Sequence, residues 1–114
     1  MISGAENTVV DDSAELTELH DMAAHAVELL KAMANEWRLM ILCQLSEGEK
    51  TVSELQAILG LSQSALSQHL AVLRREKIVR SRKEAQSVSY SLCGDDATKV
   101  MQTLHKVFCE RQGE

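Results

Sequence analysis

Three cysteines and four histidines are the side chains in this sequence best suited to thiol chemistry or to binding a transition metal such as zinc. Cys43 lies in an apolar run, Cys109 lies near the end of a predicted helix, and Cys93 stands between a predicted strand and that helix. A cysteine among aliphatic residues is usually a small buried hydrophobe, whereas an accessible thiolate is a nucleophile that can serve as a sensor. The residue types alone leave both interpretations of Cys43 open.

A metal site and a thiol enzyme are the alternative chemistries. His105 and Cys109 are four residues apart on one helical face, an acceptable half-site for Zn²⁺ that Cys43 and His20 or His25 could complete. A thiol enzyme would pair a cysteine nucleophile with a histidine base. However, the sequence has no Cys-x-x-Cys, no glycine-rich loop and no oxyanion-hole motif. We therefore predict no catalytic residue and no enzymatic activity.

Composition restricts the class of protein. The 114 residues suit one domain, and 45% apolar with 25% charged residues is typical of a globular chain. No apolar run approaches the ~18 residues of a membrane helix, and the polar N-terminus has no basic region followed by an apolar one. Three cysteines are too few for a disulfide scaffold. We expect a cytoplasmic protein with free thiols and no membrane partner.

The first half of the sequence predicts two helices. Residues 1–11 read as a disordered acidic tail, and residues 12–112 as one folded domain. Asp12 and Glu15 have capping-box spacing and open a long amphipathic helix that runs to Met33. Asn35 is a plausible break and cap. Residues 37–45 are nearly all apolar, which predicts a helix buried on most sides.

The second half predicts a helix-turn-helix followed by a hairpin. Thr51 and Glu54 form a capping box, Gly60 ends the short helix, and Ser62 caps a helix over residues 63–76. Residues 79–83 can pair with the alternating residues 88–92 across 84–86, and Asp95 or Asp96 caps a last helix. The predicted fold class is mainly α with a small β-hairpin, a winged helix-turn-helix of order α-α-α-α-β-β-α.

Charge and side-chain type indicate what the helix over 63–76 contacts. The net charge of −5 hides an asymmetry, since residues 62–83 hold six bases and one acid. Small polar residues lie opposite the apolar stripe of this helix, where glutamine and serine can bond base edges and arginine can meet phosphate. The predicted DNA contacts are Thr51, Gln63, Ser64, Ser67, Gln68, His69, Arg74, Arg75, Arg82, Lys83 and Gln86.

The same residues also allow interpretations other than DNA binding. The basic stretch can be an ordinary solvated surface, and His69 can be a half-buried structural histidine beside Leu70. Residues 1–30 hold seven acids and no Lys or Arg, so the acidic first helix could instead bind a basic protein partner. The adjacent helix, tight turn and basic hairpin favour double-stranded DNA as the partner.

Four stretches resemble one family. Residues 30–43 (LKAMANEWRLMILC) and 61–74 (LSQSALSQHLAVLR) are similar to the signature segments of the ArsR/SmtB family of bacterial winged-helix regulators. Residues 82–88 and 104–109 add a resemblance to its HlyU, BigR and SqrR branch. The resemblance covers about residues 20–110. It implies a homodimer built from the first and last helices, an inverted-repeat operator, and repression relieved by a signal, although some members act as antirepressors.

The resemblance also implies what is sensed. The family's common metal sites use a Cys-Val-Cys pair or an Asp-x-His start of the last helix, and residues 41–45 and 95–98 match neither. We therefore expect no standard metal site and no cofactor. Cysteines at the positions of Cys43 and Cys109 form the sensing dithiol in this branch, and the implied inducer is a reactive sulfur species or another thiol oxidant. Cys93 has no role in that pattern.

Two positions depart from the family pattern. Lys77 stands where relatives often have glycine, at the turn from the recognition helix into the wing, and a lysine with positive φ costs about 1 kcal/mol. Trp37 stands where many relatives carry arginine or another polar residue. We expect the turn at Lys77 to differ, and leave Trp37 open between core, interface and exposed patch.

Overall fold

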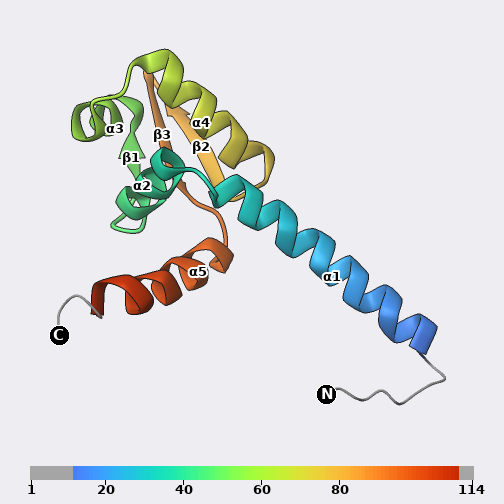
Figure 1. Cartoon of the computed structure of the whole chain (residues 1–114). Helices are drawn as coiled ribbons and strands as arrows, with labels where there is room; N and C mark the ends of the chain where they lie inside the picture. Colours follow the sequence, from blue (N-terminus) through green and yellow to red (C-terminus); the bar gives the residue numbers. More distant parts are fainter. Residues whose placement is uncertain (1–11, 111–114) are drawn as a thin grey trace.

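A computed structural model describes residues 12–110 of the chain. The predicted tail (1–11) and the last predicted residues of the domain (111–112) lie outside them. The elements in chain order are α1 (Asp12–Met33), α2 (Glu36–Leu45), β1 (Lys50–Thr51), α3 (Val52–Leu59), α4 (Gln63–Arg75), β2 (Val79–Glu84), β3 (Ser87–Leu92), α5 (Asp96–His105) and the π-helical segment η2 (Lys106–Glu110). The predicted winged helix-turn-helix is confirmed, with β1 and η2 as additions (Figure 1).

Side-chain caps set the start of three helices. Asn35 accepts the backbone N–H of Arg38 at 3.1 Å and opens α2. Thr51 and Glu54 form the predicted capping box, each accepting the backbone N–H of the other, at the start of α3. Ser62 accepts the N–H of Ala65 and opens α4. These bonds satisfy N–H groups that have no partner inside the helix, so these three predicted caps are confirmed. Asp95 occupies the N-cap position of α5, as predicted, but its side chain makes no capping hydrogen bond.

The wing is a three-stranded antiparallel sheet of order β1-β3-β2. The predicted hairpin is confirmed with a shorter turn, because Glu84 pairs with Ser87 and only two residues remain between the strands. The short strand β1 was not predicted. It places Lys50 opposite Tyr90, whose other neighbour is Ser81, so Tyr90 lies in the central strand.

The turn from α4 into β2 keeps a left-handed residue despite the lysine. Lys77 has φ +62°, its N–H bonds the carbonyl of Arg74, and the N–H of Ile78 bonds the carbonyl of Leu73. This pair of bonds is a Schellman motif, and the buried side chains of Leu73 and Ile78 flank it. The expectation that the turn differs was therefore wrong. The capping bonds and the apolar contact offset the cost of a side chain at positive φ.

The core lies between α2, α3, α4 and the sheet. Its fully buried side chains are Ile41, Leu42, Leu55, Leu66, Leu70 and Leu73. The prediction that α2 is buried on most sides was wrong: Ile41, Leu42 and Leu45 face the core, whereas Met40 is 40% exposed and Cys43 is exposed. Trp37, left open by the sequence, lies on this outer side and is 36% exposed. One face of α2 has packing partners within the chain, and the opposite face has apolar residues open to solvent.

α1 joins the body only at its C-terminal end. Ala32 and Met33 are buried there, while the rest of the helix projects away from the body (Figure 1). Its apolar stripe is therefore exposed, with Leu16 at 63% and Met22 at 62%. The end of the described chain has a similar residue, since Phe108 in η2 is 59% exposed. Among the described helices, none has the length and apolar character needed to cross a membrane.

Candidate nucleic-acid interface and thiol pair

α4 separates its residues by type between two faces. Leu66, Leu70 and Leu73 point into the core and are at most 1% exposed. The opposite face is exposed and carries small or amide side chains, namely Gln63, Ser64, Ser67, Gln68 and Ala71. The Ser62 cap leaves no bulky residue at the N-terminal end of this face. A helix with such a face can lie close to the floor of a DNA major groove, where amide and hydroxyl groups can bond base edges.

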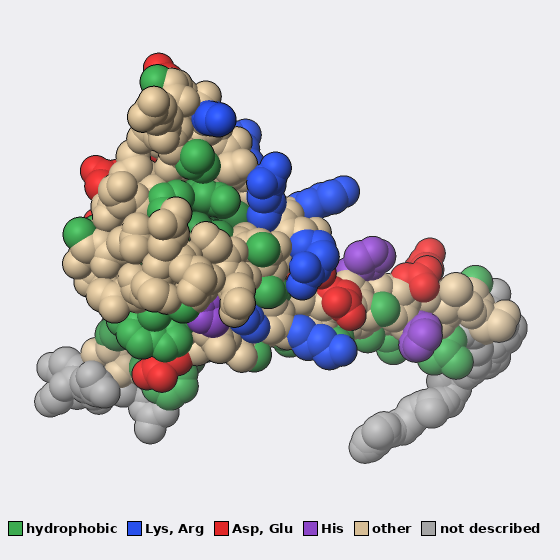
Figure 2. All heavy atoms as spheres, turned by 90° about the horizontal axis from the view of Figure 1, so that it is seen from above, with side chains coloured by type: hydrophobic (Ala, Val, Ile, Leu, Met, Phe, Trp, Pro, Cys, Tyr) green, Lys and Arg blue, Asp and Glu red, His purple; other side chains and the backbone are tan. Residues whose placement is uncertain are grey.

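The C-terminal end of α4 carries two exposed arginines, Arg74 and Arg75. Their charge is favourable at a helix C-terminus. The ion pairs found within the described residues involve Lys50, Arg82 and Lys99, so neither arginine has a carboxylate partner there. Lys and Arg side chains gather along one flank of the body, whereas acidic side chains stand on the α1 rod (Figure 2).

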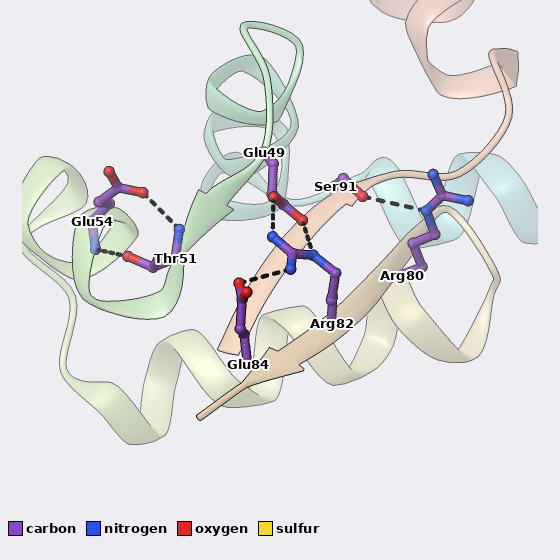
Figure 3. A network of polar contacts seen from close by, with 7 residues as sticks. All are labelled: Glu49, Thr51, Glu54, Arg80, Arg82, Glu84 and Ser91. Atoms are coloured by element: carbon purple, nitrogen blue, oxygen red, sulfur yellow. Dashed lines mark hydrogen bonds and ion pairs between the residues drawn. The ribbon is translucent and has the colours of Figure 1, made fainter. Parts of the chain in front are cut away.

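The wing holds its arginines differently. Arg82 Nη2 donates to Glu49 Oε1 at 2.8 Å and Nη1 to Glu84 Oε1 at 2.9 Å, while Nε donates to the second Glu49 oxygen at 3.1 Å (Figure 3). The hydrogen bonds and the charge of Arg82 hold the pKa of Glu49 below its ordinary value, and the two carboxylates raise the pKa of Arg82. Lys83 and Gln86 are exposed at the turn end of the hairpin. We name the three joined side chains, Glu49, Arg82 and Glu84, the wing clamp.

His69 lies half-buried on α4 rather than on its outer face. Its Nδ1 is 3.5 Å from Nη1 of Arg38, and burial, followed by the charge of Arg38, lowers the pKa of His69. Arg38 also donates to the carbonyl oxygens of Ala32 at 2.5 Å and Lys31 at 3.3 Å. The same guanidinium thus links the last turn of α1, α2 and α4. His69 is therefore half-buried beside Arg38, and its predicted contact with DNA stays a prediction.

The predicted DNA contacts fall into three places. The α4 face and its arginines form one continuous surface, while Arg82, Lys83 and Gln86 lie on the hairpin and Thr51 caps α3 with a half-buried side chain. Sequence reasoning missed Arg38 and Glu49. Arg38 lies inside the signature stretch and could have been found there, but nothing in the local sequence of Glu49 predicts a partner 33 residues away.

Cys43 lies on α2 and Cys109 lies on η2. Both are exposed and form no disulfide in the described chain, and Cys93 is exposed in the segment after β3. Cys43 is partly covered by neighbouring atoms, and this partial burial, then the negative charge of a Cys109 thiolate and that of Glu47, raises the pKa of Cys43. Within the described part of a single chain, no three His, Cys, Asp or Glu side chains gather as metal ligands. His20, His25 and His105 are exposed.

The fold and this surface define a winged helix-turn-helix protein of the DNA-binding class. The family model of bacterial regulatory proteins of the arsR family matches residues 35–81, which run from the cap of α2 into β2. The transcriptional activator HlyU of Vibrio cholerae is 53% identical over 95 residues, covering 83% of this chain and 88% of that protein. The chain belongs to the ArsR family, whose members are DNA-binding transcriptional regulators. The resemblance in the sequence is confirmed.

Further relatives agree on the branch and the fold. The biofilm growth-associated repressor of Agrobacterium fabrum is 40% identical over 94 residues, covering 82% of this chain and 80% of that protein. The structure of reduced HlyU from Vibrio cholerae has a TM-score of 0.76 at 53% identity, covering 81% of this chain and 97% of that one. The transcriptional repressor BigR from Xylella fastidiosa has a TM-score of 0.76 at 35% identity, covering 82% and 95%.

Proposed function

We propose that this protein is a dimeric, sequence-specific transcriptional repressor that binds an inverted-repeat operator and is switched by a Cys43–Cys109 dithiol. The observation that carries the DNA-binding part is the outer face of α4, where exposed serine and glutamine residues continue into two arginines without carboxylate partners in the described chain. Phosphate contacts would fix the position of α4, and the serines and glutamines would read bases. The site of action would be the cytoplasm, where the operator is.

The exposed apolar residues of α1 support a homodimer. A stripe that includes Leu16, Leu19 and Met22 extends beyond the body, and Phe108 of η2 is likewise open. An exposed apolar surface of this extent marks an interaction site. Two copies that cover these residues would also place two α4 helices on successive half-sites of one DNA face. Leu19→Glu should give a monomer in sedimentation experiments, whereas Glu15→Gln on the same helix should remain a dimer.

The proposed switch is a two-step sulfur transfer. A thiolate at Cys109 takes the terminal, sulfane sulfur of a small persulfide RSSH and releases RS⁻, which leaves a persulfide on Cys109. The Cys43 thiolate then attacks the inner sulfur of that persulfide and expels HS⁻, which leaves a Cys43–Cys109 disulfide. The dithiol is oxidised by two electrons and the sulfane sulfur is reduced to sulfide. A second transferred sulfur would give a polysulfide bridge instead.

The raised pKa of Cys43 supports this division of roles. A thiol with a raised pKa is mostly protonated at neutral pH, so Cys43 suits the second, resolving step better than the first. Since Cys109 and Glu47 contribute negative charge, Cys109→Ser and Glu47→Gln should each lower the pKa of Cys43. The pH profile of Cys43 alkylation measures this directly. A profile that neither substitution moves would contradict the pairing.

DNA binding of the cysteine variants tests the switch. Fluorescence anisotropy with DNA from upstream of the protein's own gene should show tight binding by reduced protein, loss after glutathione persulfide and recovery with reductant. Cys43→Ser and Cys109→Ser should bind DNA and no longer respond, and the control Cys93→Ser should respond like the unaltered protein. Full response by either of the first two variants would overturn the dithiol.

Antirepression is the second candidate function, because one relative is named an activator and another is named a repressor. HlyU of Vibrio cholerae is described as an activator, whereas the protein of Agrobacterium fabrum is described as a repressor. A purified RNA polymerase assay on the operator promoter separates them. A repressor lowers transcription by itself, whereas an antirepressor raises it only when a competing DNA-binding protein is present.

A further inference from the structure

An open pocket of about 360 Å³ lies between the recognition helix and the central strand of the wing. Four of its lining residues come from α4, between its fifth and its last residue, and the fifth comes from β3. The lining residues are Ser67, Ala71, Arg74, Arg75 and Tyr90. Of these, the sequence pointed to the α4 residues and gave Tyr90 no role beyond the strand pattern.

The lining has the chemistry of an anion site. It offers two guanidinium groups and two hydroxyl donors and contains no carboxylate. Within the described residues, no side-chain hydrogen bond or ion pair engages Ser67, Tyr90 or either arginine, whereas Arg82 and Arg80 on the neighbouring strand both have partners. Guanidinium and hydroxyl groups together match the oxygens of a phosphodiester, which accept hydrogen bonds and carry one negative charge.

Tyr90 is held more rigidly than the other donors. It pairs with Lys50 on one side and Ser81 on the other, and its ring is half-buried against the core. Its hydroxyl therefore has a fixed position, whereas an arginine must lose several rotamers to reach the same ligand. A fixed donor binds its ligand at a lower entropy cost. Ala71, with a single methyl group, leaves the space between Tyr90 and the arginines open.

We propose that this pocket binds one backbone phosphate of DNA, with the Tyr90 hydroxyl as a ligand beside Arg74 and Arg75. The inference rests on the proposed function, because Ser67 belongs to both the pocket and the face of α4 that would read bases. A phosphate held there fixes how deep α4 enters the groove and at which register. A free phosphate or sulfate ion has the same chemistry, so the test separates the two sources.

Tyr90→Phe removes the hydroxyl and keeps the ring in the core. We expect about tenfold weaker operator binding, the usual loss when a hydrogen bond to a charged group is removed. The dependence of affinity on salt should stay that of the unaltered protein, because no charge is lost. Ser87→Ala, an exposed hydroxyl on the same strand outside the pocket, is the matched control and should bind normally.

A neutral methylphosphonate placed at each operator phosphate in turn locates the partner. At one phosphate position the substitution should weaken binding by the unaltered protein, and it should weaken binding by Tyr90→Phe much less. The reason is that the Tyr90 hydroxyl and this phosphate contact each other, so removing either one removes the same interaction. Equal affinities of Tyr90→Phe and the unaltered protein would overturn the site and leave the proposed function standing. A protein that binds no duplex at all would instead overturn the proposed function and the site with it.

Competition by inorganic phosphate distinguishes a site for a backbone phosphate of DNA from a site for a free phosphate ion. At constant ionic strength, millimolar phosphate should displace DNA from the unaltered protein and from Tyr90→Phe equally little. Displacement that depends on the Tyr90 hydroxyl would show a small-ion site and overturn the assignment to DNA.

Discussion

The end of α4 and the wing carry the same basic side chain in opposite electrostatic circumstances. Arg75 is exposed on α4 and has no carboxylate partner in the described chain. Arg82 lies between two carboxylates, at 2.8 Å from Glu49 and 2.9 Å from Glu84. A phosphate can approach Arg75 directly, but at Arg82 it must displace a carboxylate from a cluster whose net charge is already −1. The number of basic residues in a stretch therefore overstates how many can meet DNA.

The two arrangements have different consequences for the same operator. Free arginines contribute affinity through phosphate contacts and the counterions these release. The wing clamp instead ties the hairpin to the loop between α2 and β1, so it orients the wing before DNA arrives (Figure 3). Affinity and orientation would thus come from different arginines. Substitutions can separate the two roles, and a loss of fold must be distinguished from both.

The largest effect should come from the core that supports both regions. Leu70→Ala removes a side chain that is 1% exposed at the centre of α4, and a buried leucine truncated to alanine costs about 3 kcal/mol of unfolding free energy. Urea denaturation followed by circular dichroism measures it. Ser67→Ala, one turn away on the exposed face, should change stability by less than about 0.5 kcal/mol. A loss equal to that of Leu70→Ala would contradict the assigned faces of α4.

The next largest effect should come from removing the charge of Arg75, and it should exceed the effect of removing the charge of Arg82. Arg75→Gln should weaken operator binding about tenfold and make the dependence of log affinity on log salt shallower by about one phosphate. Arg82→Gln should cost about threefold or less, because its charge is already matched by carboxylates. Anisotropy titrations over a series of salt concentrations give both quantities. Equal losses in the two variants would show that phosphate displaces Glu49 readily, and that the clamp does not set the difference.

Much of this comparison depends on contacts that short-range patterns do not encode. The caps at Asn35, Thr51 and Ser62 were predictable, because each involves residues three apart. The period of the apolar residues likewise predicted α4 and the hairpin. The pairing of Lys50 with Tyr90, and of Glu49 with Arg82, joins residues more than thirty positions apart. A two-residue strand and a single loop glutamate have no periodicity from which either could be predicted.

The helix that contains Cys43 was predicted correctly in type but wrongly in burial. Its apolar run correctly predicted a helix but wrongly predicted burial on most sides, because hydrophobicity does not say whether the partner surface belongs to the same chain. Met40 and Trp37 remain on the open side of α2. The turn at Lys77 was mispredicted for a related reason, since the intrinsic preference of lysine was overruled by the Schellman bonds around it.

A smaller effect should come from opening the clamp on its acidic side. Glu49→Gln removes a negative charge beside the wing and leaves Arg82 with one carboxylate. We expect about threefold tighter DNA binding with a steeper dependence on salt, because Arg82 can now take a phosphate. Glu36→Gln, an exposed acid at the start of α2 that does not contact Arg82, is the charge-matched control. Weaker binding by Glu49→Gln would mean that orienting the wing matters more than releasing the arginine.

The smallest effect is the titration of the clamp. The hydrogen bonds from Arg82 lower the pKa of Glu49, so the carboxylate stays ionised below the ordinary glutamate value of about 4.3. A lowered folded pKa means that the pair stabilises the fold above that ordinary value, and that this contribution is lost as pH falls through the folded pKa. Carboxyl NMR of labelled glutamate should show the lowered pKa, and Arg82→Gln should raise it toward the ordinary value. Because the pKa of Glu49 is lowered and that of Arg82 is raised, both stay charged near neutrality, and the affinity difference between Glu49→Gln and the unaltered protein should stay constant over the neutral range. An affinity difference that changes with pH in the neutral range would mean that another titrating group acts on Arg82. It would contradict the claim that Glu49 and Glu84 alone control the charge of the wing.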